Sequence, residues 1–333
     1  MQYLLNNTIL SGPARVRNRA DGLGFILPVP EVCLVFLKTW ASEGVDRLSL
    51  EADWNSTAVV NNVASYCNNT IVITHSAGLN VLPWADNPNV TAILAAHLPG
   101  QETGNSIVDI LYGAVNPSGK LPYTIAHNAS DYDFAAVTNS TELQETEDPD
   151  AWHSNFTEGL LIDYRHFDYH NQSVLYEFGY GLSYTTFDVS DLRAQPTLPN
   201  VTLSLRPEQA PTQPGGNPTL WAVLYVASVN VTNTGDVPGA AVPQLYLSLP
   251  STIPGNPTPV NVLRGFDKVF IQPGESVNVQ FPLTRRDLSY WDTMAQDWLL
   301  PSGMVGVNVG FSSRDLRLNA QLPIAPMGNA THL

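Results

Sequence analysis

Three loops of this sequence collect polar residues that are able to do chemistry. They follow the apolar runs VCLVFLK, TIVITH and VTAILAAH, and their polar members are Lys38, Glu43, Asp46, Arg47, His75, Ser76, His97 and Glu102. Because ligands bind beyond the carboxyl ends of the strands in an open parallel sheet, we expect these residues to share one edge. The sequence lacks G-x-S-x-G, phosphate-loop, G-x-G-x-x-G and H-E-x-x-H motifs. The loops therefore favour carboxylate chemistry, of which glycoside hydrolysis is the commonest two-carboxylate form.

Two glutamates compete for the role of general acid and base. Glu102 follows a Pro-Gly turn at the start of a predicted helix, where the helix dipole favours the ionised carboxylate. We therefore interpret Glu102 as a capping residue that fixes its loop, and as the fallback catalytic candidate. Glu43 lies in a long loop beside Trp40, whose indole would favour the protonated form that a general acid needs. Composition alone would make Glu43 a solvated loop charge.

The remaining polar loop residues have ordinary structural interpretations. Asp46 and Arg47 are adjacent in sequence, and we expect them to pair and hold the loop rather than to react. His75 and His97 stand at predicted strand ends, where hydrogen-bonded structural histidines are more common than catalytic ones. These four residues enter the predicted site only as supports.

The elements that position these loops have the pattern of an α/β domain. Residues 32–38, 70–75 and 90–97 are short, apolar runs typical of strands that are buried on both faces. Residues 56–66 and 102–112 carry apolar side chains at helical spacing. The order strand, helix, strand, strand, helix predicts a mostly parallel sheet sandwiched by helices.

The second half of the sequence has a different periodicity. We assign residues 31–193 to the α/β domain, 194–217 to a Pro-rich linker and 218–333 to an all-β domain. Alternating apolar residues separated by turn formers predict an antiparallel, immunoglobulin-like sandwich of about seven strands there. Residues 1–30 fit no periodic pattern, and we expect this segment to be poorly ordered.

Composition excludes several classes of partner. Thirty acidic and fifteen basic side chains give a formal charge of −15, which repels phosphate backbones and anionic lipids. We therefore expect no nucleic-acid partner. No apolar run approaches the roughly 20 residues of a membrane helix, and residues 1–30 lack the features of a secretory signal. We find no cofactor motif and no zinc-ligand spacing, so we expect neither a cofactor nor a metal.

Cysteines and Asn-x-Ser/Thr sequons bear on the compartment. Cys33 and Cys67 allow either one disulfide or two buried thiols, and we favour the thiols. Eleven sequons are more than the composition accounts for, and they favour a secreted glycoprotein. The glycosylation candidates are Asn55, Asn68, Asn89, Asn128, Asn139, Asn155, Asn171, Asn200 and Asn230.

Ordered blocks along the chain allow a family resemblance to be stated. They include VFLKTWASEG, NPNVTAILAAHLPGQETGNSIVDILYGAVNPSGKLPYTIA, EGLLIDYRHFD, YEFGYGLSYTTF and LRGFDKVFIQPGES. Together they resemble fungal β-glucosidases of glycoside hydrolase family 3, from about Val32 to Pro323. Members of that family have an N-terminal barrel, an α/β sandwich and a fibronectin type III-like domain. This chain resembles the last two domains, and residues 1–30 fall outside the resemblance.

The resemblance implies a chemistry and a site. The family cleaves terminal non-reducing β-D-glucosyl residues with retention, using an aspartate nucleophile in the barrel and a glutamate acid/base in the α/β domain. Glu43 matches that glutamate by position, although the family's Ser-Gly-Glu-Gly-Tyr segment reads Ala-Ser-Glu-Gly-Val over residues 41–45 here. The nucleophile aspartate has no counterpart in this chain. We therefore expect a β-glucosidase fragment that acts on β-glucosides or cello-oligosaccharides only with the missing barrel, and is inactive alone.

Two alternatives remain open from the sequence. The chain is alternatively a non-catalytic carbohydrate-binding or scaffolding remnant that kept two accessory domains, or part of a β-xylosidase of the same family. The resemblance implies an extracellular location for the full-length protein. Neither the aglycone preference nor the oligomeric state follows from these residues.

Overall fold

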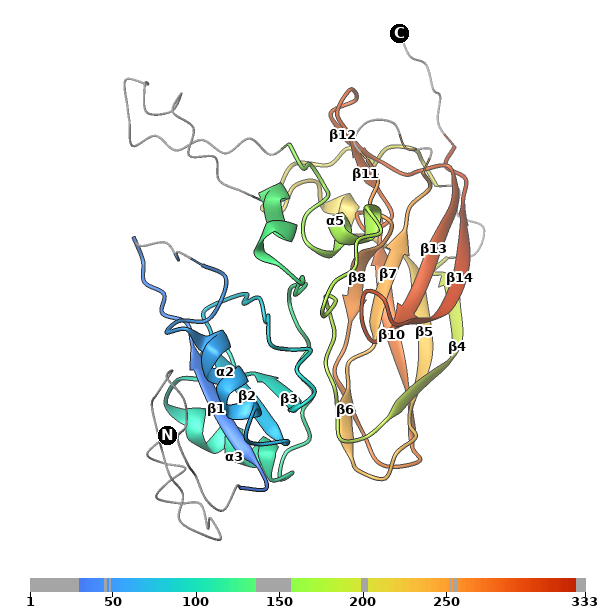
Figure 1. Cartoon of the computed structure of the whole chain (residues 1–333). Helices are drawn as coiled ribbons and strands as arrows, with labels where there is room; N and C mark the ends of the chain where they lie inside the picture. The colour runs from blue at the N-terminus through green and yellow to red at the C-terminus, as the bar shows by residue number, and fades with distance from the viewer. Residues whose placement is uncertain are drawn as a thin grey trace, which may run out of the picture. The chain divides into compact units, whose positions relative to one another are not determined.

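The computed structural model describes residues 30–44, 47, 49–135, 157–198, 203–251, 253 and 257–327 (Figure 1). They belong to two compact units. The first unit holds Met1–Val115 and Ile125–Asp133, and the second holds Asn116–Thr124 and Phe134–Leu333. The chain therefore passes between the units three times. Within the described ranges, every helix is too short or too polar to cross a bilayer.

The first unit is built on a three-stranded parallel sheet, as the sequence predicts. Its strands are β1 (Cys33–Lys38), β2 (Thr70–His75) and β3 (Val90–Ala95), in the order β1-β2-β3. The central strand β2 is the most buried of the three, because its run of β-branched residues is covered on both faces. The unit also contains the helices α2 (Ser56–Ala64) and α3 (Thr103–Leu111), the short 3₁₀ turn η1 (Gly100–Glu102) and most of η2 (Ala129–Ala135).

Cys33 and Cys67 form a disulfide, so our preference for two buried thiols was wrong. Cys33 opens β1, and the parallel register pairs it with Thr70, the first residue of β2. The turn after α2 leads directly into β2 and therefore brings Cys67 beside Cys33. The Cα–Cα distance of 6.3 Å lies in the range that a disulfide spans. The sequence left this pairing open because it depends on strand order and register.

The second unit is a β-sandwich with two principal sheets, of three and four strands. The three-stranded sheet has the order β10-β5-β4 and the four-stranded sheet has the order β14-β13-β7-β8. The strands are β4 (Phe187–Pro196), β5 (Val223–Asn233), β7 (Gln244–Ser248), β8 (Val262–Phe266), β10 (Ser276–Thr284), β13 (Gly303–Gly310) and β14 (Leu316–Ile324). The inward members of the alternating runs form one core, with Val229, Leu245, Val279 and Val307 buried. The predicted seven-stranded antiparallel sandwich agrees with these two sheets.

Short elements complete the second unit. They are the hairpin β11 (Tyr290–Asp292) with β12 (Asp297–Leu299), the pair β6 (Gly239–Ala241) with β9 (Val269–Ile271), the helix α5 (Tyr164–Tyr169) and the 3₁₀ turn η3 (Pro218–Trp221).

The start of the sandwich and the Pro-rich segment differ from the sequence expectation. β4 pairs with β5 along the three-stranded sheet, so residues 194–196 belong to a strand rather than to a linker. Further along, the backbone N–H of Leu205 donates to the carbonyl oxygen of Met327 at 3.2 Å. Leu220 is buried and packs at the end of the same segment. The Pro-rich stretch is therefore in part structural, because backbone hydrogen bonds tie it to the sandwich.

Candidate functional site

The end of β1 carries Glu43, the predicted acid/base residue. Glu43 lies in a turn that leaves β1 beyond its carboxyl end, and Gly44 has a φ of 78°, which glycine adopts without strain. The Glu43 side chain is exposed, and the indole of Trp40 is 57% exposed. The described residues thus give Glu43 an open setting rather than the indole shielding that we expected. A carboxylate in this position is accessible to a ligand.

The base of this turn is fixed on both sides by hydrogen bonds. The backbone N–H of Thr39 donates to the carbonyl oxygen of His75 at 2.8 Å, which joins the ends of β1 and β2. The backbone N–H of Trp40 donates to Asp53 Oδ2 at 2.6 Å. Asn80 donates through Nδ2 to Thr39 Oγ1 at 3.0 Å. These contacts hold the chain immediately before Glu43, so the position of the turn is set by the sheet edge.

Lys38 and Trp54 lie together near the same edge. Lys38 is the last residue of β1, and its Nζ lies 4.9 Å from the centre of the Trp54 ring. This cation–π contact holds a tryptophan that is 71% exposed. The sequence analysis selected Lys38 but missed Trp54, because nothing in the spacing shows that residues 51–54 return to the end of β1.

Asp46 and Arg47 were predicted to pair, and the structure describes only Arg47. Asp46 lies outside the described residues, so its predicted pairing with Arg47 stays a prediction. Arg47 donates through Nη1 to the carbonyl oxygen of Leu79 at 2.7 Å, which ties the loop after β1 to the loop after β2. Arg47 is therefore a structural support, as we interpreted it.

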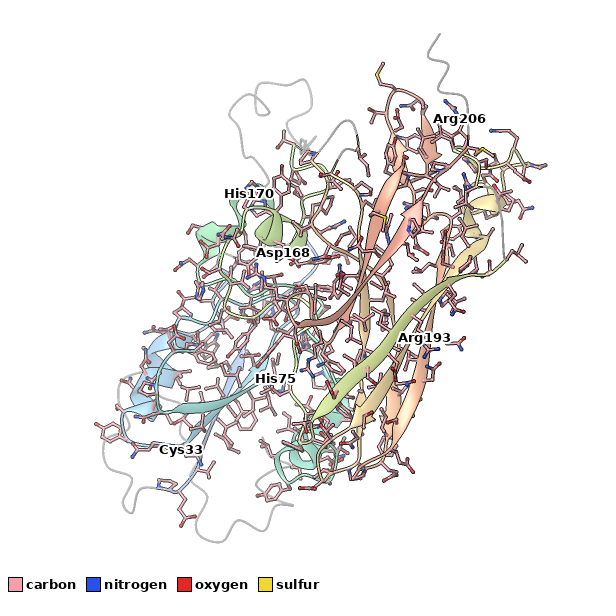
Figure 2. The ribbon with its side chains drawn as sticks, turned by 90° about the vertical axis from the view of Figure 1, so that its right-hand side faces the viewer. Cys33, His75, Asp168, His170, Arg193 and Arg206 are labelled. Carbon is pink, nitrogen blue, oxygen red and sulfur yellow. A yellow bond between two sulfur atoms is a disulfide. The ribbon has the colours of Figure 1, made fainter. Side chains whose placement is uncertain are left out.

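The two candidate histidines have different surroundings. His75 is the last residue of β2 (Figure 2), whereas His97 lies in the loop after β3. Burial lowers the pKa of His75, and a hydrogen bond with the Leu37 backbone partly opposes that effect. The His75 ring stacks on Phe36, with the ring centroids 6.4 Å apart. His97 has a φ of 51°, and its Nδ1 lies 3.1 Å from the carbonyl oxygen of Ala95. Ser76 is buried and donates to the carbonyl oxygen of Gly78 at 2.6 Å.

Glu102 occupies the N-cap position of α3, but our prediction that its side chain caps the helix was wrong. Its carboxylate makes no cap hydrogen bond to the helix backbone. Instead, Glu102 Oε2 accepts a hydrogen bond from Asn105 Nδ2 at 2.6 Å. β1 and β3 flank β2 on opposite sides, so Glu43 and Glu102 leave the sheet from different strands. Within the described part of the chain, no three His, Cys, Asp or Glu side chains gather to hold a metal ion.

The sequence analysis missed a set of charged residues in the second unit. Asp163 has a φ of 54°, and its carboxylate accepts hydrogen bonds from the Thr124 N–H, the Thr124 hydroxyl and the Tyr164 N–H at 2.6–2.9 Å. Burial raises the pKa of Asp168, and the Arg314 guanidinium, 2.8 Å away, opposes this rise. Asp163 and Asp168 fall in the block EGLLIDYRHFD, which was the only signal in the sequence.

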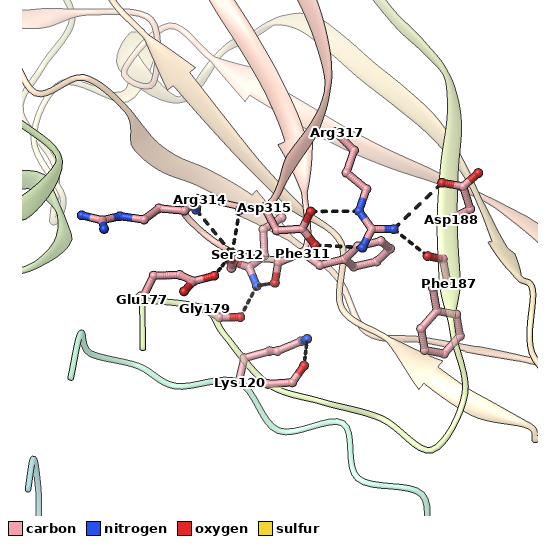
Figure 3. A network of polar contacts seen from close by, with 12 residues as sticks. Lys120, Glu177, Gly179, Phe187, Asp188, Phe311, Ser312, Arg314, Asp315 and Arg317 are labelled. Atoms are coloured by element: carbon pink, nitrogen blue, oxygen red, sulfur yellow. Dashed lines mark hydrogen bonds and ion pairs between the residues drawn. The ribbon is translucent and has the colours of Figure 1, made fainter. Parts of the chain in front are cut away.

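A polar network joins the residues around 177–181 to the end of the sandwich (Figure 3). Gln244 Nε2 donates to the carbonyl oxygens of Gly179 and Phe311 at 3.0 and 2.8 Å. Ser312 donates to Glu177 Oε1 at 2.7 Å, and Lys120 Nζ donates to the carbonyl oxygen of Gly181 at 2.6 Å. Gly179 has a φ of 80°, and a Cβ there would meet the Gln244 carboxamide. We interpret this network as structural, because three of these four hydrogen bonds end on backbone carbonyls and the fourth joins two side chains of the network.

Comparisons with known proteins define the class. Residues 26–184 match the Glycosyl hydrolase family 3 C-terminal domain, and residues 241–313 match the Fibronectin type III-like domain. The chain belongs to glycoside hydrolase family 3, of which it carries these two domains, as the sequence resemblance implied. The mostly parallel α/β domain followed by an all-β sandwich is thereby confirmed as well.

Particular relatives are similar over almost the whole chain. Probable beta-glucosidase G from Aspergillus flavus is 58% identical over 317 residues, which are 95% of this chain and 37% of that protein. Probable beta-glucosidase G from Neosartorya fischeri is 57% identical over 332 residues, with 99% and 39% covered. This chain thus spans about two fifths of the length of these relatives. The second alignment also includes most of residues 1–30, which we had placed outside the resemblance.

Solved structures give the same result. The beta-D-glucoside glucohydrolase from Trichoderma reesei has a TM-score of 0.78 at 41% identity, covering 89% of this chain and 40% of that one. Beta-glucosidase D2-BGL from Chaetomella raphigera has a TM-score of 0.78 at 42% identity, with the same shares covered.

Proposed function

We propose that this chain is the C-terminal portion of a β-glucosidase that removes terminal non-reducing β-D-glucosyl residues with retention of configuration. The observation that carries the proposal is the identity of 57–58% to proteins named probable beta-glucosidase G, over 95–99% of the chain. Cellobiose and other β-glucosides are the substrates that this similarity favours.

Glu43 is the proposed acid/base residue. In the first step its carboxyl group donates a proton to the oxygen of the leaving group, and in the second its carboxylate takes a proton from the attacking water. Its exposed position beyond β1, on a turn held through Thr39 and Trp40, supports this role. Retention requires a second carboxyl group about 5–5.5 Å away. We propose that an aspartate from the part of the relatives that this chain does not cover supplies it.

We also consider how the Glu43 carboxyl group is shielded from water. A general acid at neutral pH needs a setting that favours its protonated form, and the described residues leave Glu43 exposed. We propose that the same additional portion covers the edge of the sheet and partly desolvates this carboxyl group.

The test uses matched variants in the full-length protein with its barrel. Glu43→Gln is expected to lower kcat/KM for cellobiose about 10²- to 10⁴-fold, the usual contribution of a general acid/base. Glu102→Gln, the matched control, is expected to stay within about threefold of the unmodified enzyme. Substrates with a dinitrophenolate leaving group need no protonation, so Glu43→Gln should retain the first step with them, and azide should restore turnover.

Two results would contradict the assignment. One is loss of cellobiose hydrolysis in Glu102→Gln with full activity in Glu43→Gln, which would exchange their roles. The other is release of nitrophenol from an aryl β-glucoside by the 333-residue chain alone, which would place a complete hydrolytic centre within these residues.

We also propose an extracellular location. The Cys33–Cys67 disulfide supports it, because such bonds persist in oxidising compartments. Four candidate sequon asparagines are exposed, namely Asn55, Asn68, Asn128 and Asn171. Asn89 and Asn230 are half-buried, while Asn139, Asn155 and Asn200 lie outside the described residues. Mass spectrometry of the protein from its native culture medium tests this location.

A further inference from the structure

The outer face of the sheet β10-β5-β4 carries a row of polar side chains. The inward residues of β5 are Ala227, Val229 and Val231, which are fully buried in the sandwich core. The alternate residues Ser228, Asn230 and Thr232 therefore point outward. Across the strands, Asn278 and Ser276 of β10 lie opposite Asn230 and Thr232. The result is a hydrogen-bonding surface of amide and hydroxyl groups.

A bulge in β4 brings a charged residue onto this face. The register between β4 and β5 shifts between Ser190 and Arg193, and Asp191 has a φ of 57°. Val189 faces the core before the bulge, whereas Leu192 faces it afterwards. Without the one extra residue of this bulge, Arg193 would point into the core. The bulge thus re-aims Arg193 to the outer face, as bulges commonly do near functional surfaces (Figure 2).

Arg193 forms part of a groove on the outer face. The groove has a volume of about 290 Å³ and is lined by Arg193, Gln195, Pro196, Val226, Ser228 and Gln280. Arg193, Ser228 and Gln280 form one row across the three strands, because Ser228 pairs with both of the others. A guanidinium, two carboxamides and a hydroxyl above an apolar floor match the hydroxyls, N-acetyl groups and C–H faces of sugars.

Asn230 lies on β5, whose residues Val226 and Ser228 line this groove. It lies two residues from Ser228 on the same side of β5, which is about 6.5 Å along a strand. Asn230, Val231 and Thr232 form a sequon, and the strand puts its asparagine and threonine on the outer face. Asn230 Nδ2 donates to Asp191 Oδ2 at 3.0 Å, and Asn230 Oδ1 accepts from Asn278 Nδ2 at 2.9 Å. One of the two Nδ2 hydrogens therefore suffices for the contact with Asp191.

We propose that Asn230 carries an N-linked glycan whose first two N-acetylglucosamine residues lie in the groove between Arg193 and Gln280. The inference rests on the proposed extracellular location. The structure indicates this occupant, because the attachment point lies on β5, which lines the groove, faces the same side, and keeps both of its hydrogen bonds after modification. Val226 provides the floor for a sugar C–H face, and the Arg193 guanidinium donates to sugar hydroxyl or acetyl oxygens.

The glycan is attached to Asn230 by a glycosyl transfer. Asn230 Nδ2 forms a bond to C1 of an oligosaccharide carried on a lipid diphosphate. The C1–O bond breaks, the lipid diphosphate leaves with the electron pair, and Nδ2 loses one proton. The remaining Nδ2 hydrogen still donates to Asp191.

The test compares two sequons in one molecule. The 333-residue chain is secreted from yeast, and glycopeptide mass spectrometry measures occupancy at each sequon. Endoglycosidase H, which cuts between the first two N-acetylglucosamines, then acts on the native protein. We expect release at Asn230 to be about tenfold slower than at the exposed Asn128, a factor that corresponds to about 1.4 kcal/mol of contacts. After unfolding, the two rates should be equal.

Variants separate the groove from general crowding on the sheet. Arg193→Ala with Gln280→Ala should bring the native release rate at Asn230 to within about threefold of that at Asn128. Lys268→Ala, which changes an exposed cation outside the groove, should leave the ratio unchanged. Thr232→Val should abolish the Asn230 glycan and Thr232→Ser should keep it.

Three outcomes would overturn the inference. An empty Asn230 with glycans at Asn68 or Asn128 would refute it while leaving the extracellular location intact. Equal native release rates, or rates that the groove variants do not change, would show that the glycan lies free of the groove. Absence of glycan from every sequon would refute both proposals. None of these results depends on β-glucosidase activity.

Discussion

Removal of the disulfide between Cys33 and Cys67 is expected to destabilise the first unit strongly. The bond closes a segment with a sequence separation of 34 residues, which contains β1, α2 and the approach to β2. The chain-entropy relation for a loop of that length gives about 4 kcal/mol at 25 °C. This is a large fraction of the stability of an ordinary domain, which is about 5–15 kcal/mol. The loss should therefore appear as frequent opening of the β1-β2-β3 sheet.

Amide hydrogen exchange measures this effect unit by unit. The amides of Val72 and Ile73 lie in the buried central strand β2, and the amide of Val307 lies in β13 of the sandwich. Cys33→Ala with Cys67→Ala should speed exchange in β2 by roughly 10²- to 10³-fold. Val307 should exchange as before, and so provides an internal control in the same sample.

Reduction of the unmodified protein supplies the matched comparison, since it opens the bond without substituting a residue. Dithiothreitol should reproduce the exchange rates of the double variant. Unchanged exchange in β2 after complete reduction would refute the reasoning, because it would mean that the closed loop adds nothing to the stability of the sheet.

Three further predictions concern charged and titrating groups. Asp163→Ala should lower the free energy of unfolding by about 2–4 kcal/mol in urea titrations, because the donors of Thr124 lose their acceptor; a change below about 0.5 kcal/mol would contradict this. Arg314→Gln should cost about 1–3 kcal/mol at pH 7, a value reduced from that of a fully buried pair because Arg314 is 32% exposed. That cost should shrink toward pH 4, where Asp168, whose pKa burial raises, takes up a proton; a cost independent of pH would oppose it. Because the pKa of His75 is lower in the folded protein, the folding stability that is present above about pH 6.5 is lost as the pH falls. His75→Gln should therefore flatten the dependence of the unfolding free energy on pH between pH 7 and 5. Parallel pH profiles for the variant and the unmodified protein would exclude His75 as the cause.

The sequence predicts the elements whose burial pattern is local. The runs 33–38, 70–75 and 90–95 are strands because β-branched apolar residues suit a sheet covered on both faces. β4 escaped prediction for an equally local reason. Its bulge at Asp191 changes which alternate residues face the core, so the sequence FDVSDLRAQP shows no continuous period of two.

The residues of the candidate site also include some that the sequence could place and some that it could not. Glu43 could be placed from the order of its motif and from the strand that precedes it, and it lies in the turn beyond the carboxyl end of β1. Trp54, Asp163 and Arg314 could not be placed, because each has at least one partner that lies far away along the chain. The Arg314–Asp168 pair, for example, joins residues 146 positions apart. Such pairs arise from tertiary packing, which cannot be inferred from the spacing of residues in the sequence.

The triple passage of the chain between the two units affects how such proteins can recombine. Asn116–Thr124 belongs to the sandwich unit although it lies among residues that the family assigns to the α/β domain. A gene fusion that joined the fibronectin-like portion at the Pro-rich stretch would separate β4 from its partner strand β5 and leave Asn116–Thr124 behind. The α/β portion and the fibronectin-like portion are therefore poorly suited to separate exchange between genes. We expect members of this family to inherit the two portions together.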